Sequence, residues 1–316
     1  MKAMIIERFG GLEELTLSEQ PKPIPAENEV LIRVRCAGVN PVDWKIEEGL
    51  LLKRIPHQLP LIPGWDVAGI VEEMGSEVGN FKKGDAVFAY CRKPQVQEGT
   101  YAEYVAMVAS AVAPKPEALT FEQAAGIPLA GLTAWQSLFD HAELKSGQVI
   151  LIHAGAGGVG SHAIQFASHA GACVLTTASP NHRRYVERLG AKAVIDYNRE
   201  DFIQTVRARY PDGIDAVFDT IGGETQSRSY EALKSGGVLV SIAHPPDESE
   251  ATRFGVKGRY CFVEPNGRQL REIGRLIEQG VVKPPSVEVF PLEEAAEAQR
   301  RSKAGHVQGK IVLRIG

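Results

Sequence analysis

The segment Gln148-Val-Ile-Leu-Ile-His-Ala-Gly-Ala-Gly-Gly-Val-Gly160 decides the fold of this chain. Val149–His153 is typical of a short buried strand, and a helix of small residues is expected from Val159 to about His169. Between the two lie three glycines in G-x-G-x-x-G spacing: Gly155, Gly157 and Gly160. In this spacing one glycine makes a tight turn, one lets backbone N–H groups approach a pyrophosphate, and one lets the helix pack on its strand. The segment therefore predicts a phosphate site at a helix N-terminus.

The surroundings of these glycines make the motif more specific. A lone G-x-G-x-x-G is a weak signal in a chain with 32 glycines, and an ordinary glycine-rich turn is the alternative. Here a second apolar segment, Cys173–Thr177, follows the expected helix and gives the order strand, helix, strand. We therefore predict that a dinucleotide is bound by Gly155, Gly157, Gly158, Val159 and Gly160. Because the motif begins near residue 150, a sizeable domain is expected to precede it.

Composition and charge exclude several classes of protein. The chain has 316 residues, of which 44% are hydrophobic and 23% charged, which indicates a globular protein of about two domains. A formal net charge of −4 gives no basic surface for nucleic acid, and no apolar run approaches the ~18 residues that a membrane span needs. Met1–Arg8 reads as the start of a strand rather than a signal peptide. The four cysteines are scattered without a C-x-x-C, so reduced thiols and a cytoplasmic location are expected.

The first 125 residues favour β-structure. Short strand-like segments alternate with Gly and Pro there: Met4–Glu7, Val30–Val39, Val67–Met74, Ala86–Tyr90 and Thr100–Val105. In the second of these, Val30, Ile32, Val34 and Cys36 alternate with less apolar positions, as in a half-buried strand.

From about Ala125 the pattern changes to alternating strands and helices. Six strands are expected at Val149–His153, Cys173–Thr177, Ala193–Asp196, Ala216–Asp219, Val238–Ile242 and Val256–Val263. Helices are expected between them at Val159–His169, Asn181–Leu189, Glu200–Tyr210 and Glu224–Lys234. This order predicts an α/β fold with a doubly wound parallel sheet over residues 126–263. Residues 264–316 add a helix at Gly267–Gln279, a strand at Val287–Phe290, a helix near Leu292–Ser302 and a strand at Lys310–Ile315, and could complete the first domain.

The end of the second strand of the parallel sheet indicates which dinucleotide is bound. NAD sites usually place an Asp or Glu about 20 residues after the glycines, but none occurs from Leu144 to Val186. Instead, a hydroxyl and basic side chains follow the strand at Ser179, His182, Arg183 and Arg184. Such groups suit the dianionic 2′-phosphate of NADPH, although the cations could also lie on a solvated helix face. We predict NADPH.

At this point the chain resembles the zinc-free quinone oxidoreductase branch of the medium-chain dehydrogenase/reductase superfamily over essentially its whole length. The resemblance rests on segments in the family's order: Gly38–Lys45, Pro63–Gly69, Gly126–Trp135, Ala154–Gly160, Val217–Gly223 and Gly305–Val312. It implies a GroES-like β-rich catalytic domain over 1–125, completed by 264–316, and a Rossmann NADPH-binding domain over 126–263. It also implies a homodimer joined along an edge strand, for which Val256–Val263 is the candidate.

The metal site of the superfamily's alcohol dehydrogenases is not expected here. At the positions that match their zinc ligands this chain has Asn40, Trp65 and Ala130, which cannot replace a thiolate or an imidazole. Without a Lewis acid, the accessible reaction is hydride delivery to an electron-poor acceptor such as a quinone or an α,β-unsaturated carbonyl. The small-molecule substrate is therefore expected to be a quinone or an enone.

The catalytic candidates are three residues of one short segment: Asn40, Asp43 and Lys45. Asn40, Pro41 and Asp43 match the start of a helix, with Asn as N-cap and an acid at N3. The resemblance places Asn40 near the nicotinamide ribose and the substrate. Lys45 departs from the tyrosine of many quinone reductases, and it could donate to the ribose or to a developing enolate oxygen, or lie on a helix surface. Asp43 is expected to orient Lys45 or to cap the turn.

The resemblance also suggests further cofactor contacts. Thr133 matches a threonine that touches the nicotinamide, and Tyr197 matches a tyrosine near the adenosine 2′-phosphate. The backbone of Ile242 and Ala243 is expected to meet the carboxamide. Each has an ordinary structural alternative, such as a hydroxyl within a helix for Thr133.

These observations together predict an NADPH-dependent, zinc-independent reductase of quinones or α,β-unsaturated carbonyls. Two alternatives stay open from the sequence. One is a 2-enoyl-thioester reductase, and the other is a non-catalytic, crystallin-like protein that binds NADPH or RNA.

Overall fold

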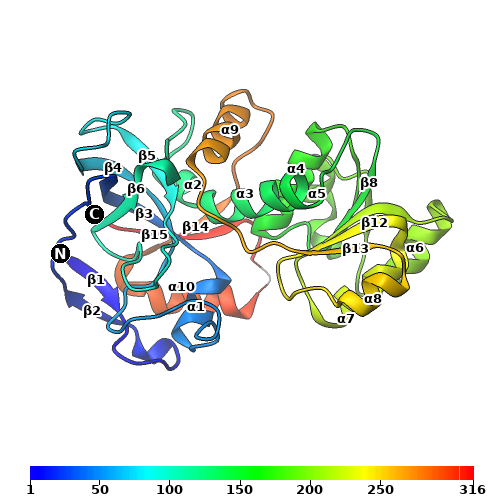
Figure 1. The fold of residues 1–316 in the computed structure, drawn as a ribbon, viewed down its shortest axis with the longest axis horizontal. Coiled ribbons are helices and arrows are strands. Elements are labelled where there is room, and N and C mark those ends of the chain that lie inside the picture. The colour runs from blue at the N-terminus through cyan, green and yellow to red at the C-terminus, as the bar shows by residue number, and fades with distance from the viewer. Residues whose placement is uncertain (306) are drawn as a thin grey trace. The chain divides into compact units, whose positions relative to one another are not determined.

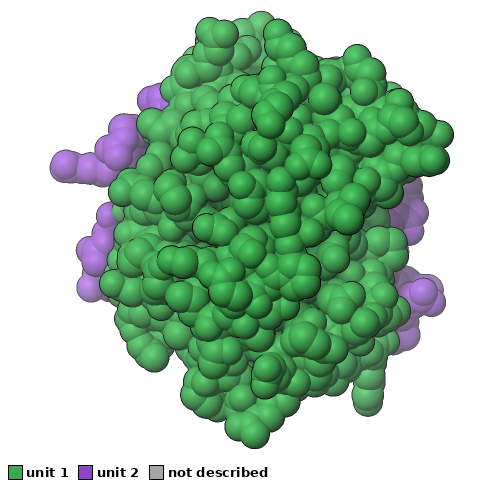
Figure 2. Space-filling model, turned by 90° about the vertical axis from the view of Figure 1, so that its left-hand side faces the viewer, with its two compact units in different colours: residues 1–129, 264–280, 284–316 green, residues 130–263, 281–283 purple. Residues whose placement is uncertain are grey.

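A computed structural model describes residues 1–305 and 307–316 of the chain and divides them into two compact units. Unit 1 comprises Met1–Leu129, Glu264–Gly280 and Pro284–Gly316, and unit 2 comprises Ala130–Val263 and Val281–Lys283. Figure 2 shows the three segments of unit 1 merged into one continuous body, in green. His306 lies outside the described residues. It belongs to Gly305–Val312, one of the segments on which the family resemblance rests.

Unit 1 is built on a seven-stranded sheet in which β3 (Glu29–Val39) has the most neighbours (Figure 1). The sheet runs in the order β14-β15-β3-β4-β5-β7, with β6 (Tyr104–Val108) also paired to β3. The remaining strands of this sheet are β4 (Asp66–Met74), β5 (Ala86–Tyr90), β7 (Val112–Pro114), β14 (Val287–Pro291) and β15 (Lys310–Arg314). Because β15 pairs antiparallel with the end of β3, the C-terminal segment completes the sheet that the N-terminal segment begins.

A two-stranded sheet and four helices complete unit 1. The small sheet pairs β1 (Lys2–Ile5) with β2 (Thr16–Glu19). The helices are α1 (Pro41–Glu47), α2 (Phe121–Ala125), α9 (Gly267–Glu278) and α10 (Ala295–Ala304). α1 follows β3 directly, so the carboxyl end of the central strand delivers the residues around Asn40 to the interior of the unit.

Unit 2 is a six-stranded, fully parallel sheet in the order β10-β9-β8-β11-β12-β13. Of these strands, Figure 1 labels β8, β12 and β13. The strands of unit 2 are β8 (Val149–Ile152), β9 (Cys173–Thr177), β10 (Ala193–Ile195), β11 (Ile214–Asp219), β12 (Leu233–Ser241) and β13 (Lys257–Tyr260). Its helices are α4 (Gly158–His169), α5 (Arg183–Arg188), α6 (Phe202–Arg209), α7 (Gly223–Ser229) and α8 (Glu248–Arg253). Helix α3 (Pro128–Trp135) spans the division between the units, and a π-helical turn, Gln136–His141, continues it.

The predicted α/β class, with a β-rich sheet domain and a doubly wound parallel sheet, is confirmed. The strand order of unit 2 reverses at β8, because β9 and β10 lie on one side of it and β11 to β13 on the other. Ligands of open α/β sheets bind beyond the carboxyl ends of the strands at such a reversal. The glycine segment follows β8 at this point.

Several predicted elements were wrong in their bounds, among them Val256–Val263, of which only Lys257–Tyr260 forms β13, and two others show the physical reason most clearly. The segment Thr100–Val105 is not a strand throughout, because Thr100 and Tyr101 form buried loop contacts and β6 begins only at Tyr104, where pairing with β3 starts. The helix expected at Glu224–Lys234 ends as α7 at Ser229, because Leu233 already pairs with Ile214 as the first residue of β12. In both places long-range pairing overrides a local pattern.

Candidate active site

The three glycines that follow β8 have different surroundings. A Cβ added to Gly155 would overlap Thr176 Oγ1 and come within 2.7 Å of Ile164 Cδ1. A Cβ added to Gly160 would overlap the Ala154 carbonyl oxygen and approach Gly155 Cα to 2.8 Å. At Gly157, by contrast, an added Cβ would meet only the Ala154 oxygen, at an ordinary 3.4 Å. Gly155 and Gly160 are therefore needed for internal packing, whereas the space at Gly157 is open to a ligand.

Gly157 is also the N-cap residue of the twelve-residue helix α4, and it forms no side-chain cap. The next residues, Gly158 and Val159, are only partly buried. The first backbone N–H groups of a helix have no partner within it, and they lie at the positive end of the helix dipole. The start of α4 thus combines open space with N–H donors, which fits the pyrophosphate of a dinucleotide.

A buried histidine, which the sequence analysis did not select, anchors the beginning of this loop. Thr177 Oγ1 accepts the Ala154 N–H at 3.0 Å and lies 3.4 Å from His153 Nδ1. His153 Nε2 lies 3.0 Å from the hydroxyl of Ser229, which itself donates to the Thr225 carbonyl at 2.6 Å. Ser229 therefore accepts the Nε2–H of a neutral imidazole. Burial lowers the pKa of His153 to about 4, which keeps the ring neutral. The one sequence signal was a polar residue ending an apolar strand.

Beyond the end of β9, the structure brings two of the predicted phosphate ligands together. Ser179 Oγ lies 3.3 Å from His182 Nδ1 at the start of a short 3-10 turn. Arg183 follows, and it donates to the Val194 carbonyl at 2.9 Å while lying 3.7 Å from a Glu187 oxygen. Its guanidinium is thus held in place although its side chain is 44% exposed.

Tyr197 and the residues after β12 complete the predicted cofactor contacts in unit 2. Tyr197 is 54% exposed, so its ring is available to a ligand. The Ile242 N–H already donates to the Asp219 carbonyl at 3.1 Å, and the Ala243 N–H to Ser241 Oγ at 3.2 Å. A carboxamide contact there would therefore use their carbonyl groups. Thr133 lies within α3 and is only 3% exposed.

In unit 1, Asn40 is the N-cap residue of α1, with Pro41 at N1 and Asp43 at N3. The Asp43 carboxylate accepts the Asn40 backbone N–H at 2.7 Å and the Tyr101 hydroxyl at 2.9 Å. Burial raises the pKa of Asp43 to about 7, although both hydrogen bonds oppose this shift. Of the two roles expected for Asp43, the structure thus has it at the helix cap.

The side chain of Asn40 lies between two buried groups of opposite charge. Its Nδ2 donates to Asp66 Oδ2 at 2.9 Å, and its Oδ1 accepts a hydrogen bond from the Lys310 ammonium. The ammonium also donates to the Val39 carbonyl at 3.1 Å and lies 3.9 Å from Asp66 Oδ2. All three residues are at most 5% exposed. Asp66, Lys310 and Tyr101 were not predicted as site residues. The signal that could have indicated Asp66 and Lys310 is a charged residue within an apolar segment.

Lys45, the third catalytic candidate, lies apart from this buried group. Its ammonium is 5.4 Å from the centroid of the Trp44 ring, which Lys303 also approaches to 5.3 Å. Burial, with a smaller contribution from the positive charge of Arg54, lowers the pKa of Lys45. Within the described residues no carboxylate lies within ion-pair distance of Lys45, so its proton is not held by Asp43.

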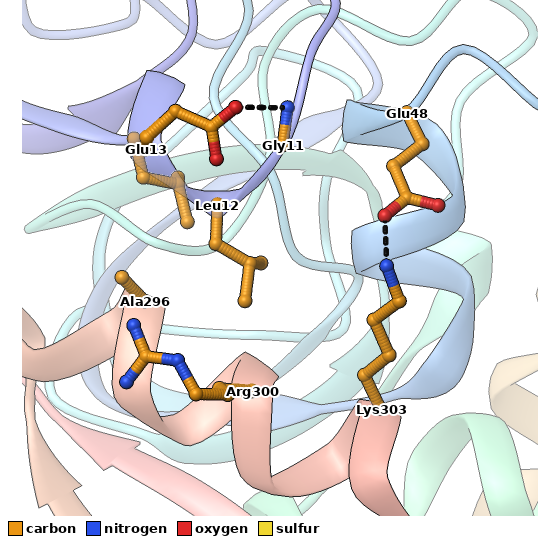
Figure 3. A pocket seen from close by; sticks show the side chains of 8 residues that line it. Gly11, Leu12, Glu13, Glu48, Ala296, Arg300 and Lys303 are labelled. Carbon is orange, nitrogen blue, oxygen red and sulfur yellow. Dashed lines mark hydrogen bonds and ion pairs between the residues drawn. The ribbon is translucent and has the colours of Figure 1, made fainter.

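One pocket of unit 1 contains none of the predicted site residues. It has a volume of about 610 Å³ and is lined by residues including Leu12, Glu48, Arg300 and Lys303 (Figure 3). Its two cations are already paired, Lys303 with Glu48 and Arg300 with Glu297. We therefore assign it no role in the site.

Comparison with known proteins identifies the family. Residues 26–117 match the model of the alcohol dehydrogenase GroES-like domain, and residues 189–313 match that of the zinc-binding dehydrogenase. The chain is 37% identical to an NADPH-dependent alkenal/one oxidoreductase of Arabidopsis thaliana, covering 99% of this chain and 79% of that protein. It is 34% identical to a quinone oxidoreductase of Mus musculus, covering 99% and 97%. The chain belongs to the medium-chain dehydrogenase/reductase superfamily.

A solved structure of this superfamily supports the same assignment. The quinone oxidoreductase from Coxiella burnetii superposes with a TM-score of 0.90 at 35% identity, covering 100% of this chain and 99% of that one. The resemblance predicted from the sequence is thus confirmed at the level of the superfamily and of its quinone and alkenal/one oxidoreductases.

The residues of this superfamily member do not fit a catalytic zinc. At the three matching positions, Asn40 is bonded to an ammonium and a carboxylate, Trp65 is 4% exposed with its edge against Tyr90, and Ala130 has no donor atom. The buried Lys310 cation beside Asn40 would also repel a metal ion. Over residues 1–305 and 307–316, no group of three or more His, Cys, Asp or Glu side chains could hold a metal.

Proposed function

We propose that this protein is an NADPH-dependent reductase that transfers a hydride to a quinone or an α,β-unsaturated carbonyl compound. The observation that carries the proposal is the loop after β8, where Gly157 leaves open space at the N-terminus of α4. The superfamily membership, and relatives named as quinone and NADPH-dependent alkenal/one oxidoreductases, support the reaction class.

The residues for NADPH lie at two places in unit 2. The N–H groups at Gly158 and Val159 would hold the pyrophosphate, in the space that Gly157 leaves open, with Gly155 and Gly160 shaping the loop. The Gly157 N–H itself already donates to the Ala154 carbonyl at 3.1 Å. Ser179, His182, Arg183 and Tyr197 would hold the 2′-phosphate, since no carboxylate from Leu144 to Val186 competes for the ribose. Thr133, Ile242 and Ala243 are proposed to line the nicotinamide end.

We further propose a zinc-independent mechanism. NADPH, when bound, supplies the hydride. The chain then has to stabilise the negative charge that develops on the acceptor, and hydrogen-bond donors suffice when this charge is delocalised over an enolate or a hydroquinone anion. Asn40 is proposed to contact the ribose and the acceptor oxygen, and Lys45, whose pKa is lowered by burial, to supply a proton. Asp43 fixes the start of α1.

The domain assignment follows from the same proposal. The GroES-like catalytic domain is assigned to 1–125, completed by 264–316, and the Rossmann domain to 126–263. The match of residues 26–117 to the GroES-like domain supports this division. The two compact units support it as well, apart from residues 126–129, which group with unit 1, and residues 281–283, which group with unit 2.

Assembly and location are also part of the proposal. In the part of the chain that the structure describes, β13 is the terminal strand of its sheet, and we propose it as the strand along which two copies join in a homodimer. The four cysteines, none in a disulfide, support a reducing compartment such as the cytoplasm. No helix of the described residues is long and apolar enough to cross a membrane.

The test is steady-state oxidation of NADPH, with NADH in parallel, against quinones, short and long alkyl enones, and 2-enoyl thioesters. We expect turnover with quinones or enones and at least a 10-fold preference for NADPH in kcat/KM. Arg183→Ala should raise the KM for NADPH and leave that for NADH unchanged, because only NADPH carries the 2′-phosphate. Binding of NADPH without turnover of any acceptor would contradict the proposal. Selective turnover of the thioesters would show that the substrate is a 2-enoyl thioester and not a quinone or an enone.

A further inference from the structure

The surroundings of Asn40 determine which way its amide group faces. A primary amide has two N–H donors on nitrogen and two acceptor positions on oxygen. Here the oxygen faces the Lys310 ammonium, which can only donate, and the nitrogen faces the Asp66 carboxylate, which can only accept. A flipped amide would place its NH2 group against the ammonium and its oxygen against the carboxylate. Both contacts would be repulsive, so one orientation is fixed.

The same contacts leave one N–H group of the Asn40 side chain for a ligand. One N–H of Asn40 is used by Asp66, which leaves the second N–H as a donor. The ammonium at Oδ1 draws electron density from the amide and makes that N–H a stronger donor, as in other charge-assisted chains of hydrogen bonds.

Stability alone does not explain these buried charges. Lys310 and Asp66 are 5% and 0% exposed, and a buried ion pair often contributes no more to stability than apolar residues of similar size. Asp66 is held further by the Leu129 N–H, which donates to Oδ1 at 2.7 Å, and Lys310 by the Val39 carbonyl. Both charges are thus kept in place around a single amide. Burial lowers the pKa of Lys310 and raises that of Asp66 to about 6.

We propose that Lys310 and Asp66 are positioning residues that fix Asn40 as a hydrogen-bond donor toward an oxygen of the bound ligand. This inference rests on the proposed function, in which Asn40 contacts the ribose and the acceptor oxygen. The oxygen it would serve is a ribose hydroxyl or the oxyanion that develops on the acceptor.

The test uses the double variant Lys310→Met/Asp66→Asn. Either single substitution leaves an unpaired buried charge and can prevent folding, whereas the double variant is uncharged at both positions. In it, the oxygen of the introduced amide is expected to keep the Leu129 N–H. Its NH2 group would then face Asn40 and favour the opposite orientation of the Asn40 amide. We expect a folded protein whose kcat is about 10- to 100-fold lower, with a smaller change in the KM for NADPH.

The matched control removes a second ion pair of the same strand, β15. Arg314 lies 2.9 Å from Glu122, and its side chain is 60% exposed. Arg314→Met/Glu122→Gln should keep kcat within about twofold, because this pair does not touch Asn40. A folded Lys310→Met/Asp66→Asn protein with wild-type kcat would overturn the inference.

A second measurement does not depend on turnover. The chain has six asparagines, so selective ¹⁵N-Asn labelling gives six side-chain amide pairs, and Asn40→Ala identifies the relevant one. We expect one proton of the Asn40 pair to be shifted downfield and slow to exchange, and this signature to be lost in the double variant but kept in the control. Averaged, rapidly exchanging protons in the wild type would overturn the inference. If the wild type reduces no acceptor, the proposed function fails, and this spectrum still decides the orientation of Asn40.

Discussion

Two glycines of one motif can be required for different reasons. Gly160 is required because its neighbours, the Ala154 oxygen and Gly155 Cα, leave no room for a side chain. Gly157 has room for a methyl group within the protein, and its φ of −73° is accessible to any residue. A requirement for glycine at this position would therefore come from the ligand and not from folding.

This contrast gives a prediction for a matched pair of variants. Gly157→Ala should keep the melting temperature of the free protein within about 2 °C and weaken NADPH binding about 10-fold, because the methyl group occupies the space of the pyrophosphate. Gly160→Ala should cost about 1–3 kcal/mol of unfolding free energy, as overpacking does. Thermal melting with and without NADPH, and fluorescence titration, measure both. Equal affinity for NADPH in Gly157→Ala and wild type would contradict a pyrophosphate at this position.

The site residues that were not predicted all depend on partners far away in the sequence. The helix cap at Asn40 was predicted from its place before Pro41 and Asp43, which is local information, whereas its role in the site was predicted from the family resemblance. Its partners Asp66 and Lys310 lie 26 and 270 positions away, so only the pairing of β15 and β4 with β3 brings them to it. His153 was likewise missed, since its role depends on Thr177 and Ser229 in other elements.

At the scale of elements, α1 and α10 are joined by an unusual buried contact. Gln299 Nε2 donates to Glu47 Oε1, while Glu47 Oε2 and Gln299 Oε1 have no hydrogen-bond partner among the described residues. Burial raises the pKa of Glu47 to about 8, with Asp43 and Glu48 adding to the shift. A protonated Glu47 could donate to the unpaired Gln299 oxygen, whereas a carboxylate could not.

This contact predicts how stability depends on pH. The pKa of Glu47 is about 8 in the folded protein and near 4.5 in the unfolded chain, so between these values the folded state binds the extra proton. Glu47 therefore stabilises the folded protein most at or below pH 4.5. As the pH rises from there to 9, the unfolding free energy falls by about 2–4 kcal/mol because of this group. Glu47→Gln should remove this part of the decline. Asp43 and Asp66, whose pKa values are also raised, should still contribute to it.

Urea unfolding of the wild type and of Glu47→Gln at pH 5, 7 and 9 measures this difference. The exposed Glu293 offers the control, and Glu293→Gln should follow the wild-type pH dependence. Parallel curves for Glu47→Gln and wild type would show that Glu47 is charged in the folded protein at neutral pH.

Most elements could be predicted because their patterns are local. The bounds of β5 and β9 match the predicted segments, and α4 begins one residue before its predicted start. Failures came where pairing with a distant strand decides the conformation. Lys234, for example, follows a helical pattern but belongs to β12, because β11 pairs with its neighbour Leu233. Short elements such as α2 and β7 have too few residues for a periodicity to be visible.

At the scale of the whole molecule, the chain has the superfamily's fold, and the proposed zinc-independent mechanism can be tested on the purified protein. We predict that prolonged treatment with EDTA or 1,10-phenanthroline leaves kcat and the melting temperature unchanged, because Asn40, Trp65 and Ala130 offer no set of ligands. Elemental analysis of the purified protein should give well below one zinc per chain. Loss of activity on chelation, restored by added zinc, would show a metal site elsewhere in the protein.

The pairing of Asn40 with Lys310 has a consequence for how the protein is made. A ribosome adds about 5–20 residues per second, so Asn40 emerges roughly 15–50 s before Lys310, which follows it by 270 positions. Until then the Asp66 carboxylate has no cation beside it, and the end of β3 has no β15 against it. The glycine loop after β8 is thus synthesised well before the group around Asn40 is complete. If Lys310 positions Asn40 as proposed, reductase activity requires a chain that has been translated through β15.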